Sequence, residues 1–255
     1  MIAEDVSVTL EERVGTLSLS RPPVNALRTQ TYRELAASLR ALQEDRACSA
    51  IVLRSAVPGI FCAGADVREL PMPREVDEER QKLTRAFFTQ VLRSPVPVIC
   101  AVDGPALGGG CQLVAACDVR LATRGARFGV PEINVGRCGG GRYLMRVLPV
   151  GTVRQMYFTG RPIGAEEAHR LGMVSELLDD ADALDARAQE LARDIASKSP
   201  TALRLAKQSL DLAESLGIEA GYEVEQQFSL RMAGTPDAAE AAAAFREKRP
   251  PVWSD

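Results

Sequence analysis

The spacing of apolar residues divides the chain into a first part that alternates strands with helices and a second part that is helical. Residues 5–20 alternate apolar and polar positions, which is typical of β-strands, and Arg21-Pro22-Pro23 ends this run. Leucines three and four positions apart predict an amphipathic helix over residues 29–45, and a second helix is predicted over 75–93. Short apolar runs predict buried strands at 50–53, 96–102 and 119–122.

From about residue 142 onward the pattern predicts helices only. Alanine-rich amphipathic segments lie at 184–197, 201–215, 218–232 and 236–248. The alternation of strands and helices before residue 135 predicts an α/β fold. The terminal helices either complete the same core or pack on another subunit. We favour the second interpretation, because such a run of helices is typical of an oligomer.

Charge and composition give no reason to expect a nucleic acid or a membrane as a binding partner. The formal net charge of -3 gives no electrostatic reason to expect a nucleic acid. The N-terminus carries acidic residues early and lacks the apolar run of a signal peptide. The longest apolar stretch, residues 96–102, contains Pro97 and is too short to span a bilayer. We therefore expect a cytoplasmic protein with no membrane partner.

Cysteine and histidine usage restricts the chemistry. The six cysteines form no C-x-x-C pair, so we expect reduced thiols in apolar surroundings rather than disulfides. His169 is the one histidine of the sequence. A His-rich metal site is therefore impossible, and a His-based triad would have to use that residue. We predict no metal site.

A Gly-rich turn at 108–110 follows the predicted strand 96–102 and opens a helix that runs to about residue 116. Glycines let a ligand approach the backbone closely, and free N–H groups at a helix N-terminus favour negative charge. The chain contains neither the G-x-x-x-x-G-K-[ST] nor the G-x-G-x-x-G phosphate-binding motif. We interpret the turn as an oxyanion site, with close backbone packing as the alternative.

Two further segments carry candidate chemistry. The small-residue loop at 61–67 makes the N–H of Ala65 a second possible donor, although the loop taken alone favours a tight connection with Asp66 as helix cap. In the segment 128–136, Glu132 is one carboxylate among apolar and small residues. Burial would raise its pKa into a range useful for proton transfer, and the alternative is an ordinary surface glutamate.

In type, order and spacing these three segments resemble the crotonase (enoyl-CoA hydratase/isomerase) superfamily. The resemblance covers nearly the whole chain. It includes the matching segments Arg21-Pro22, Asn25-Ala26-Leu27, Phe158-Thr159-Gly160, Gly172-Met173-Val174 and Ala244-Phe245-Arg246-Glu247-Lys248-Arg249-Pro250.

The resemblance implies a spiral of ββα units over residues 1–190, which carries the CoA-thioester site, followed by a helical region over 191–255. In this family the C-terminal helices form trimers, which often pair into hexamers. The implied substrate is an acyl-CoA thioester, with coenzyme A as part of the substrate and no separate cofactor.

By the same resemblance, the N–H groups of Ala65 and Gly109 form an oxyanion hole for the thioester oxygen. Lys248 or Arg249 is expected to approach a CoA phosphate, from the same or a neighbouring subunit, although a basic residue at a helix end is also favoured by the helix dipole alone. The residues expected to contact substrate or CoA are Ala63, Gly64, Asp66, Gly108, Gly140 and Lys248.

One position departs from the family pattern in a way that affects the reaction. A hydratase of this family uses two glutamates, and here the first position is Gln112, three residues beyond Gly109, while the second is Glu132. An amide can position a water or hold Glu132, but it cannot exchange a proton at neutral pH. One acid–base group contributes about 10²–10⁴-fold, so ordinary hydration should be impaired. Δ3,Δ2-enoyl-CoA isomerases and hydratase-lyases that act on aromatic enoyl-CoAs retain only the second glutamate.

A second Gly-rich turn, at 139–141, also departs from the family, which commonly has a proline where Gly139 stands. Gly140 falls where a hydratase positions its water and where dienoyl-CoA isomerases place an aspartate, so the latter activity is disfavoured. Arg137 either recognises a carboxylate on the substrate or is simply solvated. Cys111 and Cys138 are interpreted as packing residues rather than nucleophiles.

We therefore predict an acyl-CoA-processing enzyme in which Glu132 is the single acid/base for an isomerisation, hydration or related lyase step. Two alternatives remain open: an acyl-CoA-binding protein with little catalysis, and a decarboxylase or thioester hydrolase in which Arg137 grips a second carboxylate. Residues at about 68–93 and 137–145 are expected to select the acyl group.

Overall fold

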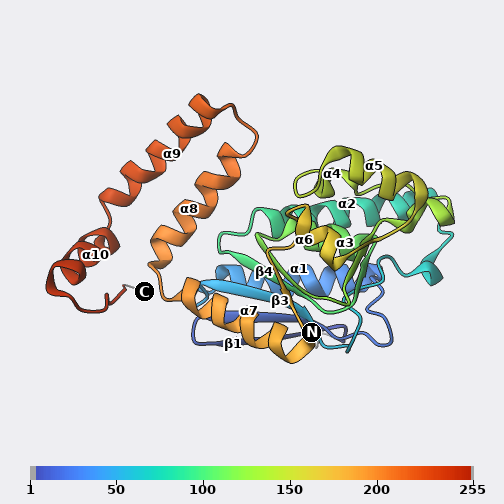
Figure 1. Cartoon of the computed structure of the whole chain (residues 1–255), viewed down its shortest axis with the longest axis horizontal. Helices are drawn as coiled ribbons and strands as arrows, with labels where there is room; N and C mark the ends of the chain where they lie inside the picture. Colours follow the sequence, from blue (N-terminus) through green and yellow to red (C-terminus); the bar gives the residue numbers. More distant parts are fainter. Residues whose placement is uncertain (1–3, 254–255) are drawn as a thin grey trace.

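A central mixed sheet and a smaller second sheet organise the computed structural model, which describes residues 4–253 (Figure 1). The first pair of the six-stranded sheet is an antiparallel hairpin, and every later pair is parallel. Its strands are, in spatial order, β1 (Val6–Glu11), β2 (Val14–Leu19), β3 (Ala50–Ser55), β4 (Val98–Val102), β6 (Val119–Thr123) and β9 (Glu176–Leu178). The second sheet contains β5 (Pro105–Leu107), β7 (Arg127–Gly129) and β8 (Ile163–Gly164).

Helices cover both faces of the main sheet. One face packs against α1 (Thr29–Glu44), α2 (Arg74–Leu92) and α3 (Gly109–Ala116), and the other against α7 (Ala181–Ala196). The alternation of β3 explains this division, because Ile51 and Leu53 join the core under α1 and α2 whereas Val52 joins the core under α7. The observed architecture is the predicted α/β fold.

Short helices connect the longer elements. They are η1 (Val67–Glu69), before α2, then η2 (Pro131–Val135), α4 (Gly141–Leu144) and α5 (Val150–Thr159), between β7 and β8, and α6 (Ala165–Arg170), after β8. The last three helices, α8 (Pro200–Ala213), α9 (Ile218–Ala233) and α10 (Pro236–Glu247), extend away from the body of the molecule as a C-terminal arm (Figure 1). Buried Lys207 of α8 ties the arm to the body, because its ammonium group donates to the carbonyl of Leu92 and pairs with Asp118, both at 2.8 Å.

Most predicted elements are confirmed, and the prediction of helices only beyond residue 142 is wrong. β9 adds a sixth strand to the main sheet beside β6, and β8 adds a strand to the second sheet. The pattern missed them because they have three and two residues, and because all three residues of β9 are half-buried, which leaves no alternation to detect. The predicted boundary between residues 190 and 191 falls within α7, whereas the arm begins with α8.

The arm leaves large apolar side chains uncovered in the single chain. α8 exposes Leu210, the start of α9 exposes Ile218 and Tyr222, and the later residues Leu230 and Phe245 are also exposed, with Ile218 at 92% and Phe245 at 87%. Uncovered apolar surface of this kind marks contact sites. Among the described helices, none is long and apolar enough to cross a membrane.

Candidate active site

The loop at 61–67 is fixed by the segment that precedes α1. The N–H of Leu27 donates to the carbonyl of Gly64 at 2.7 Å, and the N–H of Asp66 donates back to the carbonyl of Leu27 at 3.0 Å. The side-chain amide of buried Asn25 adds a bond to the carbonyl of Phe61 at 3.0 Å. These bonds are the structural reason for the Asn25-Ala26-Leu27 pattern, which holds the loop in place.

The side chain of Asp66 serves the loop and does not reach the pocket. Its carboxylate accepts from the guanidinium of Arg68 at 2.7 Å and from that of Arg21 at 2.9 Å, and it caps η1 through the N–H of Arg68. The hydrogen bonds from Arg68 hold the pKa of Asp66 well below its usual range. Asp66 does not line the cavity, and its contact with substrate or CoA stays a prediction.

Two backbone turns meet beside the start of α3. A Cβ on Gly64, which has a φ of +87°, would lie 2.8 Å from the carbonyl oxygen of Leu107 and 3.3 Å from the nitrogen of Gly109. The glycine therefore permits a contact that no other residue allows. Within residues 4–253, neither the N–H of Ala65 nor that of Gly109 donates a hydrogen bond to the protein. Both donors predicted from the sequence are thus close in space and unengaged.

Glu132 lies against the same turn. It belongs to η2, and one of its carboxyl oxygens, Oε1, would lie 2.9 Å from a Cβ on Gly108. The other oxygen, Oε2, is buried and has no hydrogen-bond partner in the described part of the chain. Burial raises the pKa of Glu132 above its ordinary value. The interpretation of a buried proton-transfer group is supported over that of a surface glutamate.

Gln112 faces Glu132 from α3 without bonding to it. Its side-chain amide has no hydrogen bond to any residue in the described ranges, and of the two possibilities, to position a water or to hold Glu132, the second has no hydrogen bond to support it. Gly140, with a φ of +86°, packs directly on this amide, and a Cβ there would lie 1.9 Å from Nε2 of Gln112. The amide is therefore free to bind a ligand, and Gly140 leaves no room for an aspartate side chain at this place.

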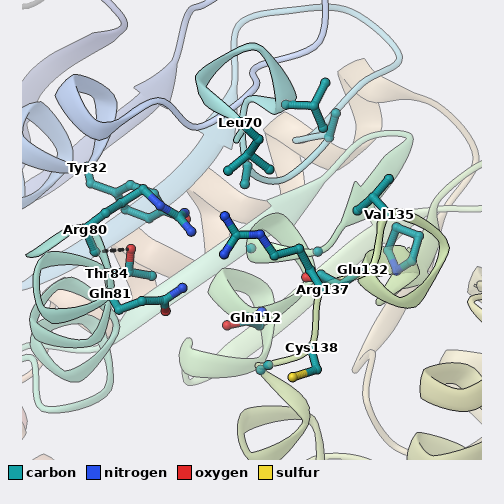
Figure 2. A pocket seen from close by; sticks show the side chains of 18 of the residues that line it. Tyr32, Leu70, Arg80, Gln81, Thr84, Gln112, Glu132, Val135, Arg137 and Cys138 are labelled. Atoms are coloured by element: carbon teal, nitrogen blue, oxygen red, sulfur yellow. Dashed lines mark hydrogen bonds between the residues drawn. The ribbon is translucent and has the colours of Figure 1, made fainter. Parts of the chain in front are cut away.

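A cavity of about 270 Å³ joins these groups (Figure 2). Of the predicted residues, Ala63, Ala65, Gly108, Gly109, Gln112, Glu132 and Gly140 line it. The sequence reasoning missed Tyr32, and it gave only the range 68–93, without single residues, for the lining residues Leu70, Arg80, Thr84 and Phe88. Arg80, Thr84 and Phe88 are spaced four apart on α2, so their shared helix face was a readable signal, but the sequence does not tell which face meets the pocket. The expectation that residues near 68–93 and 137–145 line the acyl site agrees with this lining.

Two cysteines near the site behave differently. Burial raises the pKa of Cys111 to about 12, which keeps it a neutral thiol, and this agrees with its interpretation as a packing residue. Cys138 is exposed and lines the pocket, so its interpretation as a packing residue is wrong. All six cysteines are free, as predicted.

Lys248 lies outside the cavity of its own chain. It ends α10, the last helix of the C-terminal arm, in a left-handed conformation. Neighbouring Arg249 binds Glu240 of the same arm at 2.6 Å. A contact between Lys248 and CoA stays a prediction, and it requires the arm of a neighbouring subunit.

The fold and the pocket together define a class of site. Two unengaged N–H groups and one carboxyl group of raised pKa lie in a common cavity of an α/β protein. This combination is typical of enzymes that stabilise an oxyanion while a carboxyl group moves a proton.

Comparison with known proteins identifies the family. The sequence model of the enoyl-CoA hydratase/isomerase family matches residues 9–255. The chain therefore belongs to this family, as the motifs predicted.

Several relatives match over most of their length. The human mitochondrial enoyl-CoA hydratase domain-containing protein 2 is 37% identical over 95% of this chain and 86% of its own. The human mitochondrial methylglutaconyl-CoA hydratase is 34% identical over 90% of this chain and 70% of its own. The crystal structure of an enoyl-CoA hydratase from Bacillus anthracis superposes with a TM-score of 0.93 at 32% identity and covers 98% of this chain and 99% of that one.

Proposed function

We propose that this protein isomerises 3-enoyl-CoA thioesters to their conjugated 2-enoyl isomers, with Glu132 as the single acid/base. One observation carries the proposal: the cavity holds one carboxyl group, buried and unpartnered at Oε2, and a neutral amide, Gln112, where a second carboxyl group would be needed for two-glutamate hydration. A shift of the double bond needs one group that takes a proton and returns it.

In this proposal Glu132 transfers the proton, and the backbone of Ala65 and Gly109 stabilises the intermediate. Ionised Glu132 removes a proton from C2 of the 3-enoyl thioester, and the electron pair moves onto the thioester oxygen to give a dienolate. The N–H groups of Ala65 and Gly109 bind this oxyanion, and loss of one such donor typically costs about 3 kcal/mol of transition-state stabilisation. Protonated Glu132 then returns the proton to C4, which leaves the 2,3 double bond conjugated with the thioester.

Hydration is the second candidate, because relatives of this chain are named hydratases. In that reaction the amide of Gln112 would hold a water. Glu132 would take one proton from the water as its oxygen adds to C3, and would return that proton to C2. The same carboxyl group would then serve as base and acid in turn.

A spectrophotometric assay separates these reactions. Purified protein is mixed with a 3-enoyl-CoA or with crotonyl-CoA, and the absorbance of the conjugated enoyl thioester is followed. A rise with the first substrate and little loss with the second supports isomerisation. Rapid loss with crotonyl-CoA would show hydration. Tight binding without turnover of either would show a CoA-ester-binding protein.

We also propose that the protein assembles as a trimer or a pair of trimers through its C-terminal arm, which leaves apolar side chains uncovered in one chain. A separate cofactor is not required by the proposed chemistry, because the chain itself supplies the oxyanion donors and the proton carrier. Activity that persists after exhaustive dialysis against a chelator would support this. The cytoplasmic location predicted from the N-terminus stays a prediction.

A further inference from the structure

The charged groups of the acyl pocket are unusual for a site that takes a plain hydrocarbon chain. Among the residues that line it, the charged side chains are Arg80, Arg137 and Glu132. Glu132 is assigned to proton transfer, which leaves two guanidinium groups without a role. Arg80 comes from α2 and Arg137 from the loop after η2, and Figure 2 shows their guanidinium ends pointing toward one another across the pocket.

Asp77, one turn before Arg80 on α2, joins the two arginines. Its Oδ1 accepts from Arg80 at 2.8 Å, and its Oδ2 accepts from Arg137 at 2.5 Å. Asp77 itself does not line the cavity. One carboxylate outside the cavity therefore orients both guanidinium groups. The side chains of Asp77, Arg80 and Arg137 together carry a net charge of +1.

Donors remain available on both arginines. Arg80 uses its Nε and one Nη for Asp77, and Arg137 uses a single Nη. A guanidinium carries five N–H donors, so each arginine keeps N–H groups that bond to nothing in residues 4–253. The side chain of Arg80 is only 9% exposed, so these donors are poorly supplied with water.

We propose that Arg80 and Arg137 bind a carboxylate at the far end of the acyl group, so that the substrate is an enoyl-CoA with a dicarboxylic acyl chain. The inference rests on the proposed function, since it names the substrate class of the same site. A carboxylate matches the paired forks of two arginines and would accept from their remaining N–H groups. An alkyl tail would displace water from the same N–H donors without accepting a hydrogen bond from them. The pocket therefore discriminates against a substrate with such a tail.

The first test measures binding alone, so that it does not depend on which reaction is catalysed. Calorimetry compares glutaryl-CoA with valeryl-CoA, and adipoyl-CoA with hexanoyl-CoA, since these saturated pairs differ only in the distal carboxylate. Wild-type protein should bind the dicarboxylic member about 10- to 100-fold more tightly, as expected for charge-assisted hydrogen bonds. Arg137→Gln should remove most of this preference by weakening the binding of glutaryl-CoA, and should not weaken the binding of valeryl-CoA.

Arg74→Gln is the matched control, because Arg74 is an exposed arginine on the same helix, paired with Glu78. It removes one positive charge without touching the pocket and should leave the preference unchanged. Equal affinity for both members of each pair in the wild type would overturn the inference, and would show that the arginines only tie α2 to the following loop. A preference lost equally in both variants would assign it to long-range charge, and would also overturn it.

Turnover is measured second. Arg137→Gln should lower kcat/KM for the 3-enoyl isomer of glutaconyl-CoA, mostly through KM, and should not lower it for the 3-enoyl-CoA of the same length that lacks the distal carboxylate. Loss of both activities would contradict carboxylate selection. If no substrate is turned over but the binding preference holds, the proposed reaction fails and the carboxylate site stands. Arg80→Gln repeats the test from the other side of the pocket, with a thermal melt to confirm folding because Arg80 is buried.

Discussion

At the scale of single residues, the burial of Glu132 suits its proposed role in proton transfer but lowers the stability of the fold at neutral pH. Desolvation raises its pKa above the ordinary value of 4.5 in the folded chain. The folded state therefore binds this proton more tightly than the unfolded state. The resulting stabilisation is fully present below the unfolded pKa and is lost as the pH rises through the folded pKa. At neutral pH the ionised carboxylate destabilises the fold, which is typical of a functional group.

Glu132→Gln should therefore raise the melting temperature at pH 7.5 by about 2–4 °C, which corresponds to about 1 kcal/mol. The difference should shrink toward zero near pH 4, where the native carboxyl group is protonated. The same variant should lower turnover by about 10²–10⁴-fold. Calorimetric melting at both pH values checks this, with exposed Glu79→Gln as the control. A lower melting temperature at pH 7.5 would contradict the assignment of Glu132 as an uncompensated buried acid.

Gln112→Glu should create the second carboxyl group of a two-glutamate hydratase. The substitution is isosteric, so the backbone of Gly140, which packs on this side chain, can stay in place. Crotonyl-CoA hydration should rise by about 10²-fold or more, because a second acid–base group becomes available. Gln81→Glu, the same change on another amide that lines the cavity, should give no such gain. Without a rise in hydration, Gln112 is not what prevents it.

At the scale of elements, the site depends on the contact between the loop at 61–67 and the start of α3. Gly64→Ala would force a Cβ to within 2.8 Å of the carbonyl oxygen of Leu107, at a φ of +87°. We expect a loss of about 1–3 kcal/mol in unfolding free energy. We also expect a fall of about 10²–10³-fold in kcat, because the N–H of Ala65 moves away from that of Gly109.

Gly59→Ala is the control that separates the effect of backbone strain from the effect of the contact between Gly64 and Leu107. Gly59 also has a positive φ, +69°, but a Cβ there would meet nothing within 4 Å. It should cost stability and leave kcat close to the wild-type value. Chemical denaturation and steady-state kinetics of both variants measure the two effects. If both variants lost kcat equally, the contact at Gly64 would have no special part in placing the donors.

At the scale of the whole molecule, we predict that the C-terminal arm carries the contacts between subunits. Exposed Leu230 and Phe245 lie on this arm, and an interface that covers them would gain about 25 cal/mol for each Å² of apolar area buried. Light scattering should give a mass three or six times the 27.5 kDa of one chain. The double substitution Leu230→Glu and Phe245→Glu should shift it toward one chain, whereas Val8→Glu, on the exposed edge strand β1, should not.

If Lys248 contacts CoA from a neighbouring arm, the dissociated variant should also bind CoA esters more weakly, and the wild type should do so when diluted below its assembly range. A monomeric wild type with full activity would contradict both the assembly and the role predicted for Lys248.

The sequence by itself determined the local features of this protein. Alternating and helical periodicities predicted the long strands and helices, because the spacing of apolar residues shows which face of an element is buried. Gly108 to Gly110, Ala65 and Glu132 were also readable, since glycine turns, small loops and a lone acid in an apolar segment have local physical causes. The replacement at Gln112 was visible for the same reason.

Only the tertiary structure decided which segments that lie far apart in the chain contact one another. β9 joins the sheet because β6 offers an open edge, although its own three residues show no pattern. Asp66 turns toward Arg21 instead of the pocket, and Asp77 binds Arg137, which lies 60 positions further along the chain, as well as Arg80. Such contacts arise from packing, which depends on distance in space, whereas periodicity and propensity act only between near neighbours along the chain.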